Sequence, residues 1–390
     1  MSGRRAVIVD IVRSPFGRGR PGGALSALHP VDLYARMLQA LVRRTGIDPA
    51  LVEDVITGCV IQVGEQAANI GRQAVLAAGF PTSVPALTID RKCGSAQQAM
   101  DFAAQGVIAG AYDLVIAGGV EMMSHAQMKS NRMGLDNLGP MHHQRYPDGI
   151  VHQGISAELI AARWNLSRTE MDEFALRSHR LAADAVDLVR QDIEPIDGIE
   201  ADEGIRRDTT LEKLAGLKPA FEDPAIAERY PQIGWRVTAG NSSQVTDGAG
   251  AILIAEEGVA RRMGLRTRAR ISSFAVVGDD PIMMLTGPIP ATRKLLSRAG
   301  LNVDAIDAFE VNEAFAAVVL AWAREVGADM RKVNRYGGAI ALGHPVGGSG
   351  VRLTANLLRA LEQDGGRLGL QTMCESGGMA NATLIERLGD

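Results

Sequence analysis

ALVRRTGIDPALVEDVITG, residues 40–58, reappears in altered form as KLLSRAGLNVDAIDAFEVN, residues 294–312. Gly46 falls on Gly300 and Val55 falls on Phe309, so 254 positions (300 − 46) separate the two stretches. Each reads as an amphipathic helix, a glycine that ends it, a short turn and an apolar strand. Self-similarity of this kind predicts a chain built from two related βα units.

Two further pairs of segments keep this spacing. CGS at residues 93–95 falls on GGS at residues 347–349, and in both places small residues precede a helix rich in alanine or leucine. The strand DLVIAGG, which starts at residue 113, matches LGLQTMC, which starts at residue 368, one position further along. A spacing that holds across three motifs favours duplication over the weak self-similarity that all βα proteins have.

The number of positions that separates matching segments becomes much smaller near the end of each half. AILI at residues 251–254 best matches ATLI at residues 382–385, an offset of 131 (382 − 251). The difference of 123 positions (254 − 131) predicts an insertion in the first half alone, at about residues 120–245. We expect the insertion to begin as a polar loop and to become helical, since Ser167 and Glu170 have the spacing of a capping box.

The composition excludes several classes of protein. Of the 390 residues, 46% are hydrophobic and 22% are charged, which is too apolar for a disordered chain. A net charge of −4 provides no excess of positive charge for binding nucleic acid. The longest apolar run, residues 314–323, is ended by Arg324 and is too short to span a membrane. Three cysteines form no disulfide framework and fit a reducing cytoplasm.

Cys93 is the first candidate for chemistry. It lies in PALTIDRKCGSAQQAMDFAAQGVIAG (residues 85–110), where an extended stretch runs through small residues into a helix. This pattern predicts a strand-to-helix elbow like that of activated serine nucleophiles. Free N–H groups and the dipole at the start of a helix stabilise a thiolate. We therefore expect Cys93 to be an activated nucleophile, with an inert buried cysteine as the alternative.

Two more candidates lie in the second half. His344 lies in GGAIALGHPVGGSG (residues 337–350), the loop richest in glycine, and histidine is the usual base for a cysteine nucleophile. Cys374 lies in TMCESGGMANAT (residues 372–383), at the end of a strand that has a counterpart in the first half. If a pseudo-twofold relates the halves, their strand ends meet at one pocket. The alternatives are a structural histidine and a buried thiol.

Other motif-like stretches lack the residues that their chemistry needs. Residues 343–349 have the glycine spacing of a P-loop, but Ser349 stands where lysine is required. GRGRPG at residues 17–22 fits a dinucleotide-binding spacing but contains a proline and precedes no convincing helix. The cysteines lack metal-ligand spacing, so we expect no metal site and interpret Cys59 as a core strand residue.

Asn312 and Glu313 are polar residues in an apolar strand-to-helix junction, VNEAFA (residues 311–316). Polar side chains in such a place need hydrogen-bond partners. These residues alone leave two roles open for Asn312: it could cap the following helix, or it could take part in a reaction.

Together these motifs resemble those of the thiolase family, the acyl-CoA:acetyl-CoA C-acyltransferases. The resemblance extends from VRSPFG at residues 12–17 to NATLIERL at residues 381–388, which is essentially the whole chain. It rests on four blocks in this order: KCGSA (92–96), NEAFA (312–316), GHPVGGSG (343–350) and CESGGM (374–379).

The resemblance implies a catalytic role for each residue that matches these motifs. Cys93 matches the nucleophile that carries the acyl group as a thioester, and His344 matches the base that activates it. Cys374 matches the cysteine that moves the α-proton of acetyl-CoA. Asn312 matches the residue that holds a water, which forms one oxyanion hole with His344. The backbone N–H groups of Cys93 and Ser376 would form the second oxyanion hole.

The resemblance also suggests residues that contact the substrate. His152 of VHQGISAE lies where the family's loop domain contacts the substrate, and Ser243 and Phe315 match positions that line the pantetheine tunnel. Lys218 of LKPAF is the cation that we assign to the 3′-phosphate of coenzyme A. Gln153 after His152 departs from the His-Met pair of short-chain enzymes. Together with GCVIQVGEQAANIGR (residues 58–72) and AFAAVVLAWARE (residues 314–325), this pair resembles the sequences of degradative actinobacterial thiolases, including enzymes that act on steroid side chains.

The fold that the resemblance implies is α/β, with two duplicated βα halves stacked as five layers (α-β-α-β-α). We expect residues 1–119 with 246–268 to form the N-terminal half and residues 269–390 to form the C-terminal half. Residues 120–245 would form an inserted loop domain, which acts as a lid.

The expected activity is that of a thiolase acyltransferase, most simply the cleavage of a 3-ketoacyl-CoA by coenzyme A into acyl-CoA and acetyl-CoA. The alternatives are condensation of two acetyl-CoA, a non-catalytic acyl-CoA-binding subunit and a decarboxylating β-ketoacyl synthase. A non-catalytic subunit would lack one of Cys93, His344 and Cys374, and a synthase would not need Cys374. Acyl-CoA, acetyl-CoA and coenzyme A are then substrates, no cofactor is required, and neither nucleic acid nor a membrane is a partner. A cytoplasmic homodimer or homotetramer is expected.

Overall fold

The order of the strands shows the same duplication as the sequence. In the computed structural model, which describes residues 3–389, the strands follow the order β4-β3-β5-β6-β1-β7-β10-β9-β8, and β2 pairs with β6. The strands are β1 (Ala6–Arg13), β2 (Gly17–Arg18), β3 (Asp54–Gly58), β4 (Ala86–Ile89), β5 (Leu114–Met122), β6 (Thr246–Glu256), β7 (Ala269–Gly278), β8 (Ala308–Val311), β9 (Leu368–Glu375) and β10 (Met379–Arg387).

Each strand of the first half has a counterpart in the second. From the outer edge inward, β4, β3, β5, β6 and β1 correspond to Val333, β8, β9, β10 and β7, where Val333 forms a parallel bridge with Phe309. The halves meet where β1 and β7 pair antiparallel at Val7 and Ile8. Because the strand order repeats on both sides of an antiparallel junction, an approximate twofold axis relates the two halves.

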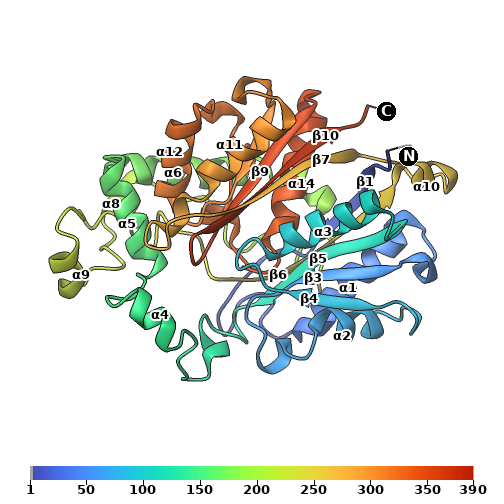
Figure 1. Cartoon of the computed structure of the whole chain (residues 1–390), viewed down its shortest axis with the longest axis horizontal. Coiled ribbons are helices and arrows are strands. Elements are labelled where there is room, and N and C mark those ends of the chain that lie inside the picture. The colour runs from blue at the N-terminus through green and yellow to red at the C-terminus, as the bar shows by residue number, and fades with distance from the viewer. Residues whose placement is uncertain (1–2, 390) are drawn as a thin grey trace.

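The helices complete five layers (Figure 1). Two of them, α3 and α14, pack against each other between the half-sheets, while α1 and α2 cover the outer face of the first half and α11 and α12 that of the second. The predicted α-β-α-β-α arrangement is confirmed. The helices are α1 (Pro30–Thr45), α2 (Ile70–Ala77), α3 (Ser95–Ala109), α4 (Pro140–Arg145), α5 (Gln153–Arg163), α6 (Arg168–Asp184), α7 (Val186–Val189), α8 (Leu211–Ala215), α9 (Pro224–Arg229), α10 (Glu257–Arg262), α11 (Pro288–Ala299), α12 (Ala316–Val326), α13 (Ala339–Leu342) and α14 (Ser349–Asp364).

Residues that the sequence predicts as helix caps lie at the ends of three of these helices, α1, α6 and α11. Gly46 ends α1 with φ 69° and Gly300 ends α11 with φ 65°, a left-handed conformation that suits glycine. The Ser167 side chain caps α6 by accepting a hydrogen bond from the N–H of Glu170. The Glu170 carboxylate pairs instead with Arg324 of α12, so the capping box is made on one side only.

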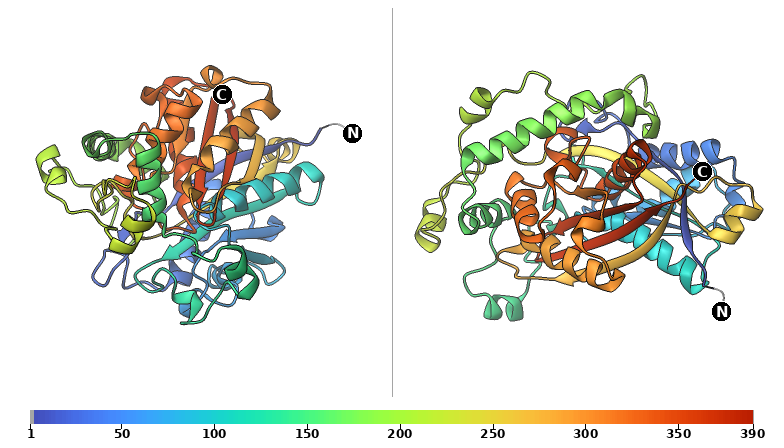
Figure 2. Two further views of the ribbon diagram at one scale, coloured as in Figure 1. Left: turned by 60° about the vertical axis from the view of Figure 1, so that its left-hand side comes forward. Right: turned by 90° about the horizontal axis from the view of Figure 1, so that it is seen from above.

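The segment between β5 and β6 carries α4 to α9 and lies along one side of the molecule, drawn green to olive in Figures 1 and 2. Its helices α5 and α6 pack on α12. Their buried side chains, such as Ile160 and Phe174, belong to the same apolar cluster as Leu295 and Trp322 of the C-terminal half. The segment therefore shares the hydrophobic core of the second half. Within residues 3–389, no helix is both long and apolar enough to cross a bilayer.

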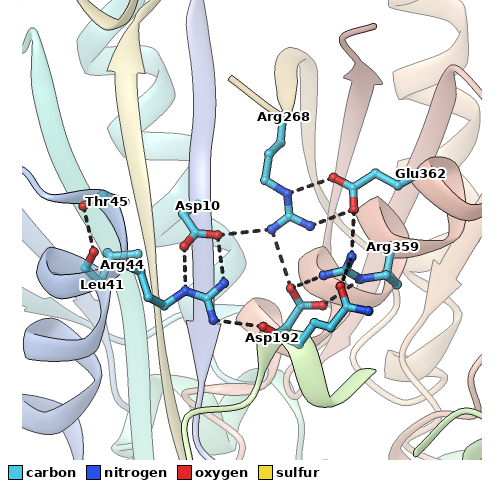
Figure 3. Close-up of polar contacts among 9 residues, drawn as sticks. Asp10, Leu41, Arg44, Thr45, Asp192, Arg268, Arg359 and Glu362 are labelled. Carbon is cyan, nitrogen blue, oxygen red and sulfur yellow. Dashed lines mark hydrogen bonds and ion pairs between the residues drawn. The ribbon is translucent and has the colours of Figure 1, made fainter. Parts of the chain in front are cut away.

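A network of ion pairs joins the two halves to this segment at Asp192, just after α7 (Figure 3). Arg268, just before β7, contacts Asp10 of β1 at 3.3 Å, Asp192 at 3.6 Å and Glu362 of α14 at 2.8 Å. Arg359 adds a 2.7 Å contact to Asp192. The network borders a polar cavity of about 600 Å³. Because Arg268 is only 9% exposed, its own charge depends on these carboxylates for compensation.

Arg268→Met is expected to lower the free energy of unfolding by about 3–5 kcal/mol, since it leaves three carboxylates without their shared cation. A urea titration followed by circular dichroism measures the change. The matched control is Arg293→Met, whose ion pair with Glu325 is exposed and should contribute less than about 1 kcal/mol. Equal effects of the two substitutions would contradict this account of the network.

Candidate active site

Cys93 lies at a sharp turn between β4 and α3. Lys92 has φ 49°, a left-handed conformation that is strained for a residue with a side chain, and the Asp90 side chain holds its N–H at 2.7 Å. Helix α3 then begins at Ser95 with Gly94 as its N-cap. The predicted strand-to-helix elbow is present, and strain of this kind is common at functional sites.

Cys93 opens onto a cavity of about 440 Å³ that both halves and the inserted segment line. Of the residues expected in the site, His152 and Ser376 also line this cavity. The complete lining comprises Val60, Ile61, Lys92, Cys93, Met128, Lys129, Asn131, Arg132, Asn137, Leu138, Ile150, Val151, His152, Gln153, Met284, Val346, Ser376 and Gly377. This cavity shares no lining residue with the one beside the ion-pair network.

A stronger effect opposes the stabilisation of a Cys93 thiolate that we expect from the helix start. Burial raises the pKa of Cys93 to about 12, and the carboxyl group of Glu375 adds to the effect. The N–H of Cys93 itself opposes the shift but is the weaker contribution. Removal of the sulfur from water therefore outweighs the helix terminus, and the resting form is the thiol. A nucleophilic Cys93 needs a base to take its proton.

Cys374 lies at the end of β9 opposite Ala380 and is 1% exposed. Its pKa is raised by burial first, then by charge on Cys93 and then by Glu375. The carboxyl group of Glu375, the residue after Cys374, packs on Gly94, the residue after Cys93. The tertiary structure thus brings the two thiols together although 281 residues (374 − 93) separate them in the chain.

His344 is a neutral imidazole with a defined tautomer. Its Nδ1 is 2.6 Å from the hydroxyl of Ser349, and that hydroxyl donates to the carbonyl of Pro345 at 2.9 Å. The hydroxyl has one proton, so it accepts from Nδ1–H, which leaves a lone pair on Nε2. Burial, with a smaller contribution from Arg352, lowers the pKa of His344 to about 3. The ring is therefore unprotonated at neutral pH, and the lone pair of Nε2 is free.

Asn312 faces His344 and does not cap a helix. Its Nδ2 is 3.5 Å from Nε2 of His344, whereas the N-cap of α12 is Phe315, which makes no side-chain capping bond. Capping by Asn312 is therefore wrong. Its Oδ1 is buried and has no partner among the residues described. The neighbouring Glu313 accepts from Ser178 Oγ at 2.6 Å, which fastens this loop to the inserted segment.

The residues expected to contact the substrate lie in different surroundings. The rings of His152 and Phe221 are 5.2 Å apart, and those of Phe221 and Phe315 are 6.0 Å apart, so three aromatic rings form a continuous wall. Ser243 donates its N–H to the carbonyl of Ala314, beside Phe315. Lys218 is exposed and is not part of the cavity lining.

Several residues beside the site were not predicted from the sequence. Ser349 sets the tautomer of His344, and its position opposite Ser95 in the duplicated turn could have indicated it. Lys129 and Arg132 supply positive charge to the cavity, but they lie in a polar loop without a recognisable pattern. Phe221 gave no signal in the sequence. Across residues 3–389, no three His, Cys, Asp or Glu side chains are placed to hold a metal ion.

Known proteins resemble this chain along its whole length. Residues 6–258 match the family model described as thiolase, N-terminal domain, and residues 265–387 match thiolase, C-terminal domain. The steroid 3-ketoacyl-CoA thiolase FadA6 of Mycobacterium tuberculosis is 47% identical, over 98% of this chain and 94% of the relative. A 3-ketoacyl-CoA thiolase of Shewanella denitrificans is 42% identical, over 99% and 100%. The crystal structure of the Bacillus anthracis acetyl-CoA acetyltransferase has a TM-score of 0.86 at 38% identity and covers 99% of each chain.

Proposed function

The chain belongs to the thiolase family, and from this premise we propose that it cleaves 3-ketoacyl-CoA with coenzyme A into acyl-CoA and acetyl-CoA. The observation that carries the proposal is the convergence of two buried thiols from opposite halves, Cys93 and Cys374. One thiol suits nucleophilic attack, and the other suits proton transfer at carbon.

In the proposed reaction His344 Nε2 takes the proton of Cys93, and the sulfur attacks the 3-keto carbon. The bond between C2 and C3 breaks, which leaves the acyl group on Cys93 and an acetyl-CoA enolate. Cys374 gives its proton to the enolate carbon and later recovers one from the incoming coenzyme A thiol. That thiolate attacks the thioester, releases acyl-CoA and leaves the Cys93 sulfur to take back the proton from His344. Condensation of two acetyl-CoA would use the same groups in reverse.

Negative charge develops on oxygen in both stages, and preorganised donors there contribute roughly 2.7–4 kcal/mol each. We propose that a water held by Asn312, together with His344, forms one oxyanion hole. The unpartnered Oδ1 of Asn312 supports this role, because a buried amide oxygen needs a donor such as water. The N–H groups of Cys93 and Ser376 would form the other hole, and both residues line the cavity.

The substrates are proposed to be coenzyme A thioesters, with no bound cofactor. Lys92, Lys129 and Arg132 line the same cavity as Cys93 and would attract the phosphates of coenzyme A. The aromatic wall of His152, Phe221 and Phe315 is suited to the apolar part of the thioester. The similarity to a steroid 3-ketoacyl-CoA thiolase makes a steroid-derived acyl group one member of the panel to test.

The test is the direct assay of the purified protein. Incubation with coenzyme A and a panel of linear and steroid-derived 3-ketoacyl-CoA thioesters should yield acetyl-CoA and the shortened acyl-CoA, both identified by mass. The thioester cleaved fastest would define the preferred acyl group. If folded protein cleaves no member of the panel and forms no adduct with any acyl-CoA, a non-catalytic acyl-CoA-binding subunit becomes the better reading.

We also propose that the chain acts as a homodimer or homotetramer in the cytoplasm. β4 is an outer strand of the sheet, and exposed strand edges invite pairing with another chain. Leu87 of β4, Phe102 and Ile108 of α3 and Leu76 of α2 are 36–42% exposed, which is unfavourable for apolar side chains in water. Three buried free cysteines suit a reducing compartment.

Leu87→Asp is expected to convert the assembly to monomers, because it places a charge on the exposed edge strand. Sedimentation velocity of the wild type and the variant measures the change. The matched control is Leu51→Asp, since Leu51 is 49% exposed but lies outside the sheet. Dimers that persist in Leu87→Asp would place the interface elsewhere.

A further inference from the structure

Glu375 is a buried carboxyl group that the proposed reaction leaves without a role. It is the last residue of β9, directly after Cys374, and it is 0% exposed. Neither of its carboxyl oxygens has a hydrogen-bond partner within residues 3–389. A buried carboxyl group without partners is costly, so its retention needs a physical explanation.

The duplication supplies an internal comparison. The strand pairings relate β5 to β9 at 254 positions, one fewer than the match of DLVIAGG to LGLQTMC suggested. This offset places Glu121 of β5 in the position of Glu375 (375 − 121). The registers agree, because Glu121 lies opposite Gly248 on β6 and Glu375 lies opposite Met379 on β10, at the offset of 131 that relates these strands. Both glutamates are 0% exposed. They are therefore two copies of one structural position.

Glu121 is fully satisfied. Its carboxylate accepts the N–H groups of Val60 at 2.8 Å, Ile61 at 3.1 Å and Gly347 at 3.0 Å, and the amide of Gln66 at 2.7 Å. The bond from Gly347 holds the turn that leads into α14, and the other three hold the loop that follows β3. In the first half this position is thus a structural anchor, and four donors compensate the burial of the carboxyl group.

Glu375 occupies the equivalent place beside the nucleophile but has no such donors. A Cβ at Gly94 would lie 2.1 Å from its Oε1, so the carboxyl group packs directly on the residue after Cys93. The amide of Asn381 lies beside it but donates to the carbonyl of Gly94 at 3.1 Å. The N–H of Cys93 is the counterpart of the Gly347 N–H, which donates to Glu121. It interacts instead with the sulfur of Cys93 and lowers the pKa of that thiol. The structure therefore keeps a carboxyl group against the nucleophile turn without compensating it.

The charges around Glu375 decide its ionisation. Burial raises the pKa of Glu375 to about 8; Arg91 in the nucleophile turn opposes this shift, while Asp101 of α3 and Asp90 add to it. In return, negative charge on Glu375 raises the pKa of both Cys93 and Cys374. Ionisation of Glu375 therefore makes the thiolate of Cys93 harder to form.

We propose that Glu375 is a positioning residue whose protonation state controls the reactivity of Cys93. As a neutral acid it permits ionisation of the Cys93 thiol, and as a carboxylate it opposes it. Glu121 anchors its turn through four hydrogen bonds, whereas Glu375, which has none, acts as a proton-dependent brake on the matching turn. The inference rests on the proposed function only in taking Cys93 as the nucleophile.

The test measures the alkylation rate of Cys93 by iodoacetamide between pH 6 and 10, with each cysteine followed separately by peptide mass. In the wild type the rate should rise about tenfold per pH unit at first and then bend near pH 8, where Glu375 ionises. Glu375→Gln should show no bend. Its rate should equal that of the wild type at pH 6.5 and exceed it roughly tenfold at pH 9.5, the effect of one removed charge.

The same substitution in the other copy is the control. Glu121→Gln should lower thermal stability, because it disturbs four hydrogen bonds, but should keep the bend in the Cys93 profile. Identical profiles in wild type and Glu375→Gln, or a ratio that is the same at every pH, would overturn the proposal. If Glu375→Gln does not fold, a straight wild-type profile would overturn it equally. Alkylation requires no acyl-CoA, so a failure of the proposed function remains distinguishable.

Discussion

Cys93→Ser is expected to lower the rate of 3-ketoacyl-CoA cleavage by roughly 10⁴–10⁶-fold, the scale on which loss of a catalytic nucleophile acts. Serine keeps the shape of the side chain, but its hydroxyl is far less acidic than a thiol. The pKa of the Cys93 thiol is already raised to about 12 by burial, and a hydroxyl in that place would be beyond the reach of a neutral His344.

The measurement is made on intact protein and on peptides after an acid quench. Wild-type enzyme mixed with acyl-CoA should carry one acyl group, on the peptide that contains Cys93, and Cys93→Ser should carry none. Cys59→Ala is the control, because Cys59 is equally buried but packs in the core of the first half. It should keep both the adduct and the activity within a few-fold. An acyl group on Cys374 in place of Cys93 would reverse the assignment of the two thiols.

Cys374→Ala is expected to separate the two stages of the reaction. Protonation of the enolate carbon should be lost, so cleavage of 3-ketoacyl-CoA should fall by about 10²–10⁴-fold, the usual contribution of a positioned acid or base. Exchange of the acyl group between acyl-CoA and labelled coenzyme A forms no carbon–carbon bond. We expect this exchange to survive, because it needs only Cys93 and His344.

Deuterium uptake into the methyl group of acetyl-CoA provides an independent readout of the same variant. Wild-type enzyme should exchange these protons with solvent and Cys374→Ala should not, while the Cys93 adduct still forms. Loss of the adduct together with exchange would indicate a disturbed nucleophile turn, and the proposed division of labour would fail. Undiminished exchange would assign the α-proton to another group.

Much of the fold was predictable because it rests on patterns that repeat in the chain. One offset identified the two halves, and the glycines at 46 and 300 end equivalent helices as expected. The change of that offset predicted an insertion at about residues 120–245, and in the structure α4 to α9 lie between β5 and β6. The sequence did not reveal that α5 and α6 complete the core of the C-terminal half, since a hydrophobic face does not specify its partner.

The electrostatic state of the site was the part most poorly predicted. Local reasoning about the start of α3 favoured a Cys93 thiolate, but burial and Glu375 raise its pKa. For Asn312 the sequence left helix capping and a part in the reaction both open, whereas the structure turns it toward His344 and begins α12 at another residue. Local reasoning cannot decide such cases, because helix-terminus effects act over a turn while desolvation depends on everything packed around the group.

The sequence by itself determined the duplicated α/β architecture and the elbow at Cys93, since short motifs and a single spacing encode them, and it predicts Cys93, His344 and Cys374 as the reacting residues. Only the tertiary structure decided which groups are neighbours and in what charge state. It brings Cys374 to Cys93, gives His344 its tautomer through Ser349, and compensates Glu121 while leaving Glu375 without donors. These differences arise because pKa values and hydrogen-bond satisfaction depend on the solvent that folding removes and the donors that it supplies.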